Sequence, residues 1–272
     1  MIEMIAEVGI NHDGELAIAK QLIDVAYTAG CQFVKFQKRD IDLCYKKEDL
    51  DRPRESKWGT TTRQQKEGLE FKYKDYVELD NYCKGKILWF ASPWDENSVD
   101  FLKRFDVPFM KIASARNVDT RLIAKAVSTG IPVILSTGGC DQNMVDRAIA
   151  MVGRENLYCI EQCTSTYPGK PCEQDVEVVK TFKEKYPWAK IGFSNHYAGL
   201  TALEMAATLG AEMLEYHITL DRTRTGSDHA ASIEPQGIFA LKAKLNIIEQ
   251  MKGDGKKKIH DSEIPIMKKL RR

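Results

Sequence analysis

The feature of this 272-residue chain that most restricts its fold is an alternation of strand-like and helix-like sequence. The strand-like runs are short and apolar, and they occur at 4–10, 32–38, 86–93, 108–114, 132–138, 157–165, 190–196 and 212–220. Between them apolar residues recur at helical spacing, most clearly over 15–30, where Gly30 stands at the expected helix end. Strand then helix, eight times over, predicts a (β/α)8 TIM barrel across residues 1–252. A doubly wound open sheet is the alternative, but the count of eight favours a closed barrel.

Composition limits the partners of such a barrel. Lys and Arg total 40 against 39 Asp and Glu, so no overall field attracts nucleic acid or an anionic membrane, and a small molecule is the expected partner. The acidic residue Glu3 near the N-terminus argues against a signal peptide, and no apolar run reaches membrane-spanning length. Seven cysteines without a CxxC pair indicate reduced thiols. We therefore expect a cytoplasmic protein.

Polar residues gather where the predicted strands end, which is where barrel enzymes assemble their active sites. The residues concerned are Glu7, Asn11, His12, Lys35, Gln37, Ser92, Lys111, Ser114, Ser136, Thr137, Gln162, Thr164, Ser165, Ser194, Asn195, His196, Glu215 and His217. Lys35 and Lys111 interrupt apolar strands, where an ammonium group is costly unless an anion pairs with it. Together with the serine hydroxyls they predict an anion site for a phosphate and a carboxylate, the alternative for Lys35 being a surface lysine on an edge strand.

Two histidines end the seventh and eighth predicted strands, which are neighbours in a barrel. His196 and His217 are therefore candidates for holding one divalent cation between their imidazoles. A histidine at a strand end is also commonly a simple hydrogen-bonding residue, and spacing alone leaves both interpretations open. The residues by themselves predict a barrel that binds an anion and a metal, without naming the reaction.

Seven motifs identify a family. The chain resembles the sialic acid synthase family in "IAEVGINHDGE", "FVKFQK", "MKIAS", "ILSTGG", "CTSTYP", "GFSNH" and "EYHITLDRTRTGSDHAASIEP", from about residue 4 to the end. The stretches "KFQKRDID" and "LDRPRESKWGTTTRQQKEGLEF" are most similar to the branch that uses a 6-phosphorylated sugar. The resemblance implies condensation of phosphoenolpyruvate with N-acetylmannosamine 6-phosphate, or a near relative, to a nine-carbon 2-keto acid and phosphate. It also implies a Mn²⁺ or Mg²⁺ cofactor and suggests a homodimer.

The same resemblance assigns roles to single residues. Glu7, Lys35 and His217 are expected to be catalytic, and His196 and His217 to be the metal ligands. The alternative for Glu7 is a simple salt-bridge partner for a buried lysine. The positions expected to bind substrate are Lys35, Lys111, Ser114, Ser136 and Ser194 for phosphoenolpyruvate, Gln37, Tyr167 and Asp228 for the sugar, and Ser165 beside them. An irregular basic segment, with Lys46, Lys47, Arg52, Arg54, Lys57 and Arg63, is expected either to close over the distal phosphate or to be a solvated loop.

The chain departs from the family pattern at three places. Arg116 stands where bacterial members carry a sugar-contacting glutamate, and Tyr216 stands where a basic residue usually precedes the metal histidine. Family members usually continue into a small antifreeze-like domain, whereas residues 253–272 here are expected to form a linker-like tail.

Three other functions remain to be weighed. One is a synthase of the same family that uses the unphosphorylated sugar. Another is a different barrel enzyme, such as a metal-dependent aldolase or a related keto-acid phosphate synthase, which is not expected to share "GSDHAASIEP". The last is a catalytically degenerate barrel that binds phosphoenolpyruvate without turning it over.

Overall fold

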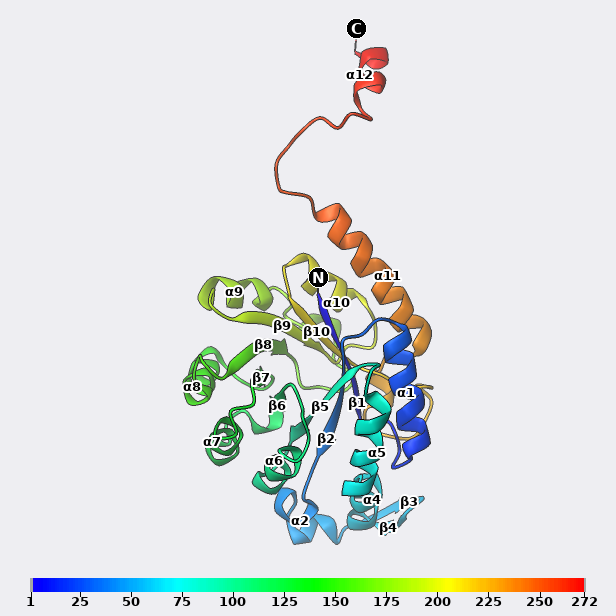
Figure 1. Cartoon of the computed structure of the whole chain (residues 1–272), viewed down its shortest axis with the longest axis vertical. Helices are drawn as coiled ribbons and strands as arrows, with labels where there is room; N and C mark the ends of the chain where they lie inside the picture. The colour runs from blue at the N-terminus through cyan, green and yellow to red at the C-terminus, as the bar shows by residue number, and fades with distance from the viewer. Residues whose placement is uncertain (1, 272) are drawn as a thin grey trace.

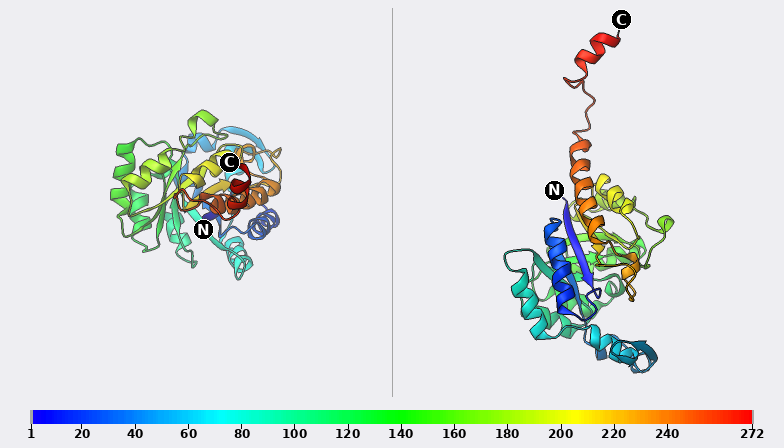
Figure 2. Two further views of the ribbon diagram at one scale, coloured as in Figure 1. Left: turned by 90° about the horizontal axis from the view of Figure 1, so that it is seen from above. Right: turned by 90° about the vertical axis from the view of Figure 1, so that its right-hand side faces the viewer.

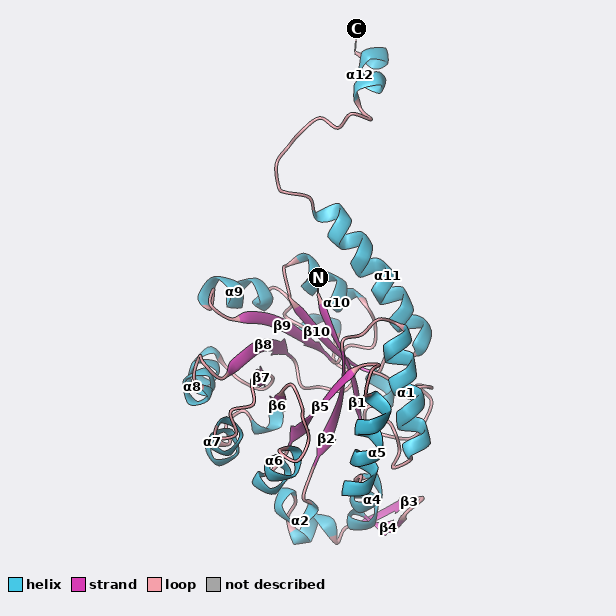
Figure 3. Ribbon diagram, viewed as in Figure 1, coloured by secondary structure: helices cyan, strands magenta, loops and turns pink. Residues whose placement is uncertain are grey.

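The computed structural model describes residues 2–271, and its centre is a closed barrel of eight parallel strands (Figures 1 and 3). The neighbours around the barrel follow the order β1-β10-β9-β8-β7-β6-β5-β2. The strands are β1 (Glu3–Gly9), β2 (Phe33–Lys38), β5 (Leu88–Pro93), β6 (Met110–Ile112), β7 (Val133–Ser136), β8 (Leu157–Cys163), β9 (Lys190–Asn195) and β10 (Met213–His217). The predicted (β/α)8 barrel is confirmed, and the open sheet is excluded.

Helices follow the strands and cover the outside of the barrel (Figure 3). They are α1 (Leu16–Thr28), α5 (Tyr73–Cys83), α6 (Glu96–Leu102), α7 (Thr120–Val127), α8 (Gln142–Val152), α9 (Val178–Lys185), α10 (Thr201–Thr208) and α11 (Pro235–Lys252). The first helix buries Ala19, Leu22, Ile23 and Ala26, a helical stripe that packs on the sheet. Asp95, Asp119 and Asp141 cap α6, α7 and α8 by accepting a backbone N–H of the first turn.

The segment after β2 is folded, so its prediction as irregular was wrong. It contains α2 (Ile41–Cys44), α3 (Lys47–Leu50), the antiparallel pair β3 (Pro53–Ser56) and β4 (Gly59–Thr61), and α4 (Thr62–Leu69). Thr61 and Gln64 form a capping box that begins α4 directly after the hairpin. Short 3-10 turns lie at η1 (Ser114–Arg116), η2 (Pro171–Glu173) and η3 (His229–Ala231).

The C-terminal segment leaves the barrel after α11. It runs without regular structure to α12 (Ile264–Leu270), at the end of the molecule opposite the β3–β4 hairpin (Figures 1 and 2). Over residues 253–271 it extends away from the barrel, and most of these residues are exposed (Figures 1 and 2). Over residues 2–271 no helix combines the length and apolar character needed to cross a membrane.

Candidate active site

A cavity of about 350 Å³ opens at the carboxyl ends of the barrel strands. Its walls contain every residue to which the resemblance assigned a catalytic, metal-binding or substrate-binding role except Asp228, namely Glu7, Lys35, Gln37, Lys111, Ser114, Ser136, Ser165, Tyr167, Ser194, His196 and His217. Each comes from a strand end or from the turn that follows it, so the closed barrel brings together residues that are distant in sequence. Of the other polar residues at the predicted strand ends, Ser92 and Glu215 also line the cavity, whereas Asn11, His12, Thr137, Gln162, Thr164 and Asn195 do not.

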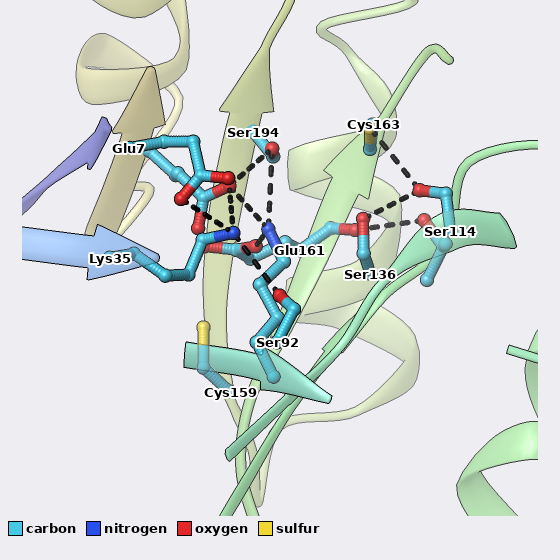
Figure 4. A network of polar contacts seen from close by, with 12 residues as sticks. Glu7, Lys35, Ser92, Ser114, Ser136, Cys159, Glu161, Cys163 and Ser194 are labelled. Atoms are coloured by element: carbon cyan, nitrogen blue, oxygen red, sulfur yellow. Dashed lines mark hydrogen bonds and ion pairs between the residues drawn. The ribbon is translucent and has the colours of Figure 1, made fainter. Parts of the chain in front are cut away.

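Lys35 on β2 lies at the centre of one half of an ion-pair network (Figure 4). Its Nζ is 2.9 Å from Glu7 Oε2 and 3.4 Å from Glu215 Oε1, and it donates a hydrogen bond of 3.2 Å to Ser92 Oγ. Gln37 donates through Nε2 to the other oxygen of Glu7, at 2.7 Å. The ammonium and its carboxylates are almost completely buried, as the isolated lysine in an apolar strand predicted.

Lys111 on β6 lies at the centre of the other half of the ion-pair network. Its Nζ is 2.6 Å from Glu161 Oε2 and 2.6 Å from Glu215 Oε1, and 3.4 Å from Ser194 Oγ. Glu215 therefore joins the two lysines, since one of its oxygens lies within 3.4 Å of both ammonium groups. Two lysines and three carboxylates share this buried volume, and their charges add to one net negative when every carboxyl is ionised.

Burial acts differently on the three carboxyl groups. Desolvation raises the pKa of Glu7 despite the opposing charge of Lys35, and it raises the pKa of Glu161 to about 7 despite Lys111. Desolvation also acts on Glu215, but Lys111 and Lys35 together outweigh it and lower the pKa of that carboxyl to about 2. Near neutral pH, Glu215 is thus the permanent anion of the network, and Glu161 is poised to gain or lose a proton.

A set of hydroxyl groups covers the opposite wall of the cavity (Figure 4). Ser114 Oγ and Ser136 Oγ are 2.8 Å apart, and a Cβ on Gly138 would stand 2.5 Å from Ser114 Oγ and also clash with Ser165 Oγ. Asn117 donates to the carbonyls of Ser136 and Gly138, which fixes the turn that carries them. The absence of a side chain at Gly138 leaves room for an anion among the hydroxyls.

His196 and His217 converge, with ring centroids 5.3 Å apart. The Nδ1 of His196 lies 2.7 Å from the carbonyl oxygen of Thr164, which fixes that ring by one nitrogen and leaves Nε2 for a ligand. His217 Nδ1 is buried without a hydrogen-bond partner among the described residues, and burial lowers the pKa of His217 to about 3, so its imidazole is neutral. Desolvation also acts on His196, but the neighbouring Cys163 thiol and the Thr164 carbonyl outweigh it and raise the pKa of that imidazole instead. Two converging imidazoles would fit a divalent cation once both are in the neutral form.

The protein can supply few other ligands to such a cation. Nowhere in residues 2–271 do three or more His, Cys, Asp or Glu side chains gather in a way that would hold a metal. An ion between the two histidines would therefore take its remaining ligands from water or substrate, an arrangement typical of catalytic rather than structural sites.

Tyr167 and Asp228 lie beside the histidines. The Tyr167 ring is 4.0 Å from the ring of His196 and 5.5 Å from that of His217, between centroids. Asp228 Oδ2 is 3.6 Å from His217 Nδ1, so this residue contacts the site although it does not line the cavity. Both are placed where a molecule near the imidazoles would touch them.

Two departures from the family pattern have different surroundings. Tyr216 is fully buried and its hydroxyl lies 3.2 Å from Cys31 Sγ, on the helix side of β10, because side chains alternate along a strand. It therefore points away from the His217 side chain. The Arg116 guanidinium lies 5.7 Å from the ring centre of Trp94, which lines the cavity, and Arg39 stacks on the same ring at 4.1 Å.

The cations of the segment after β2 are mostly neutralised by neighbouring carboxylates. The pairs are Lys47–Asp51, Arg52–Asp49 at 2.9 Å, Lys57–Glu15 at 2.5 Å and Arg63–Asp42 at 2.8 Å. Arg54 has no ion pair within the described part of the chain. Burial first, then Arg39 and Arg54, lower the pKa of the Lys66 ammonium, while Asp228 raises it. Arg54 lines another cavity together with Arg224 and Ser227, the residue before Asp228 in the sequence.

One member of the buried network, Glu161, was not predicted from the sequence. Glu161 is an acid in the middle of the apolar run at 157–163, and it is fully buried against Lys111. The reasoning that selected Lys35 and Lys111, a lone charge in an apolar barrel strand, applies equally to Glu161 and would have found it.

The chain is similar to known proteins both in sequence and in fold. A model of the NeuB family matches residues 22–257. The N-acetylneuraminate-9-phosphate synthase of Homo sapiens is 35% identical over 271 residues, covering 98% of this chain and 76% of that protein. The N,N'-diacetyllegionaminic acid synthase of Campylobacter jejuni is 31% identical over 269 residues, covering 96% of this chain and 80% of the relative.

A solved structure with the same architecture is the N-acetylneuraminic acid (sialic acid) synthetase from Leptospira borgpetersenii serovar Hardjo-bovis in complex with citrate. It superimposes with a TM-score of 0.85 at 29% identity, and the alignment covers 100% of this chain and 93% of that one. The sequence and fold comparisons therefore agree with each other and with the resemblance of the motifs.

Proposed function

This chain belongs to the NeuB family and is a phosphoenolpyruvate-dependent sugar acid synthase, and we propose that its acceptor is N-acetylmannosamine 6-phosphate or a closely related acyl-hexosamine phosphate. In the proposed reaction C3 of phosphoenolpyruvate bonds to the aldehyde carbon of the open-chain sugar. Water adds at C2 and inorganic phosphate leaves, which gives a nine-carbon 2-keto acid phosphate.

The observation that carries this proposal is the pairing of two buried lysines with a wall of serine hydroxyls in one cavity. Lys35 and Lys111 supply positive charge for the carboxylate and phosphate of phosphoenolpyruvate, and Ser114 and Ser136 supply hydrogen-bond donors. In a water-poor cavity such contacts are stronger than at the surface, because the local dielectric is low.

Glu7 is placed to handle a proton beside the reacting carbon. Its carboxyl is fixed by Lys35 on one oxygen and by Gln37 on the other, and burial raises its pKa toward the range of a general acid or base. We assign it the orientation of the water that adds at C2, with Gln37 holding both Glu7 and the sugar.

His196 and His217 would hold the divalent cation of the family, Mn²⁺ or Mg²⁺. When bound, such an ion polarises a carbonyl as a Lewis acid and so favours attack on the sugar aldehyde. Tyr167 and Asp228, which contact the two histidines, are then suitably placed to orient the sugar hydroxyls.

The distal phosphate of the acceptor is assigned to Arg54 and Lys66. Arg54 has no carboxylate partner within residues 2–271, unlike Lys47, Arg52, Lys57 and Arg63. Arg54 lines a cavity that also contains Ser227, the neighbour of Asp228, and Lys66 follows on α4, so we place both cations on the sugar side of the site. The human relative, named a 9-phosphate synthase, supports the same choice.

The test is phosphate release with mass detection of the product. The protein is mixed with phosphoenolpyruvate, Mn²⁺, and either N-acetylmannosamine or its 6-phosphate. Product from the phosphorylated sugar alone supports the proposal, and product from the free sugar alone assigns the chain to the branch that uses unphosphorylated acceptors. Binding of phosphoenolpyruvate without turnover of any acyl-hexosamine would identify a degenerate barrel.

Paired variants test the assignment of the phosphate. Lys66→Gln and Arg54→Gln are expected to raise the KM for the sugar phosphate about 10- to 150-fold, because each removes one charge-assisted contact worth roughly 1.5–3 kcal/mol. The KM for phosphoenolpyruvate should not change. Lys47→Gln is the matched control, since that lysine is 79% exposed and already paired with Asp51. If all three variants have the same KM for the sugar phosphate, Arg54 and Lys66 do not bind its phosphate.

A further inference from the structure

One buried carboxylate in the network has no role in the reaction as proposed. Glu161 lies on β8 with no exposed surface, and the polar contact of its side chain is the 2.6 Å ion pair with Lys111. Lys111 is shared between Glu161 and Glu215 at equal distance, so its ammonium is occupied on two sides by carboxylates. Two of the three ammonium hydrogens of Lys111 serve these carboxylates and the third lies toward Ser194, so an incoming anion gains most from Lys111 when one carboxylate releases it.

The groups that face Glu161 come from several strands around the barrel. Lys111 on β6, Lys35 on β2 and Glu215 on β10 act on it through their charges, and the thiol of Cys159 lies on its own strand. Its neighbours in the sheet, Ser136 on β7 and Gly192 on β9, do not ionise near neutral pH.

With every carboxyl ionised, the buried set carries three negative and two positive charges. These belong to Glu7, Glu161, Glu215, Lys35 and Lys111. Phosphoenolpyruvate would bring up to three more negative charges into the same volume, so like charges would repel strongly at low dielectric. Neutralising one carboxyl removes the excess negative charge before the anion enters.

We propose that phosphoenolpyruvate binding is coupled to the uptake of one proton by Glu161, which acts as a positioning residue for Lys111. When protonated, Glu161 no longer holds the ammonium, and Lys111 can turn toward the incoming anion while keeping its contact with Glu215. This inference rests on the proposed function, because it takes phosphoenolpyruvate to be the anion.

Glu161, rather than Glu7 or Glu215, is the group that takes the proton, because Lys111 is its single ion-pair partner among the described residues, whereas Glu7 is held by Lys35 and Gln37 and Glu215 lies between two lysines. Burial raises the pKa of Glu161 to about 7, whereas Lys111 and Lys35 keep the pKa of Glu215 near 2 against the same desolvation. Below pH 7 Glu161 is already neutral in the free protein, so phosphoenolpyruvate binding is accompanied by little proton uptake. Above pH 7 one proton must be taken up, so affinity for phosphoenolpyruvate falls by up to about tenfold per pH unit.

The experiment is isothermal titration of the protein with phosphoenolpyruvate at pH 8 in two buffers that differ in ionisation enthalpy. The wild type is expected to take up about one proton, and its dissociation constant should rise close to tenfold from pH 7.5 to 8.5. Glu161→Gln should bind with near-zero proton uptake and a nearly flat pH profile. Glu3→Gln is the matched control, because Glu3 also pairs with a lysine, Lys190 at 2.8 Å, and does not line the cavity.

The outcomes separate this inference from the function on which it rests. No binding of phosphoenolpyruvate by the wild type would overturn the proposed function. Binding by the wild type without proton uptake at pH 8 would overturn the role of Glu161 alone, and this measurement needs no variant to fold. Proton uptake that persists in Glu161→Gln would also overturn it, because another group would then be the acceptor.

Discussion

Replacing Lys111 by Met tests the buried network most directly, because it removes a cation and keeps most of the side-chain volume. The ammonium lies 2.6 Å from both Glu161 and Glu215, and all three groups are at most 3% exposed. Breaking a buried ion pair by removing one partner typically costs about 3–5 kcal/mol. Glu215 retains Lys35 at 3.4 Å, so we place the loss of unfolding free energy at the lower end, about 3 kcal/mol at pH 8.

The sign of the pH dependence follows from the protonation of Glu161. Its pKa in the fold is raised to about 7, above that of an unfolded glutamate, and loss of Lys111 raises it further. Between pH 6 and 8 the folded variant then binds a proton that the unfolded chain does not, so its stability falls as pH rises. Lys111→Met should therefore differ from the wild type less at pH 6 than at pH 8.

Urea unfolding at both pH values measures the stability, and calorimetry measures phosphoenolpyruvate affinity. Affinity should fall about 10- to 150-fold, the equivalent of one charge-assisted contact worth roughly 1.5–3 kcal/mol. Lys190→Met is the control, since its pair with Glu3 is about a quarter exposed and is worth at most about 1 kcal/mol. Equal losses of stability in the two variants, with unchanged phosphoenolpyruvate affinity in Lys111→Met, would refute the reasoning.

Two other substitutions test the rest of the site. His217→Gln is expected to weaken Mn²⁺ binding at least about tenfold in a direct titration, because it removes one of two protein ligands. His12→Gln is the control and should leave Mn²⁺ binding unchanged, because the His12 ring stacks on Phe71 outside the cavity. Gly138→Ala should weaken phosphoenolpyruvate binding with little change in Tm, because the added Cβ crowds Ser114 Oγ inside the cavity. If this variant binds phosphoenolpyruvate with wild-type affinity, the anion does not bind at the serine hydroxyls.

The fold could be predicted because its signals are local. Apolar strands alternating with helical stripes need only a few neighbouring residues to be recognised, and eight repeats leave a closed barrel as the simplest arrangement. The folded segment after β2 was not predicted, because its strands β3 and β4 are short and polar. They are held by packing against α4 rather than by an apolar alternation of their own.

The lining of the site was predicted for a related reason. Lys35, Lys111, His196 and His217 stand out because each is a charged or ionisable side chain in or directly after an apolar strand, and the barrel brings strand ends together. Asp228 came only from the family resemblance, since it lies in a loop whose path no periodicity specifies, and the structure brings it to His217. The roles of these residues remain predictions for the experiments above.

The partner of Lys111 depends on how the barrel is staggered. Lys111 pairs in register with Ile134 on β7, and Ile134 with Cys159 on β8, so the residue level with Lys111 is Cys159 rather than Glu161. The ammonium nevertheless reaches Glu161, two residues further along β8, because strand tilt raises that position toward the long lysine side chain. A strand pattern says which residues share a face but not how far neighbouring strands are shifted. The excess negative charge that makes proton uptake necessary therefore arises from the closure of the barrel, although each of its charges is visible in the sequence.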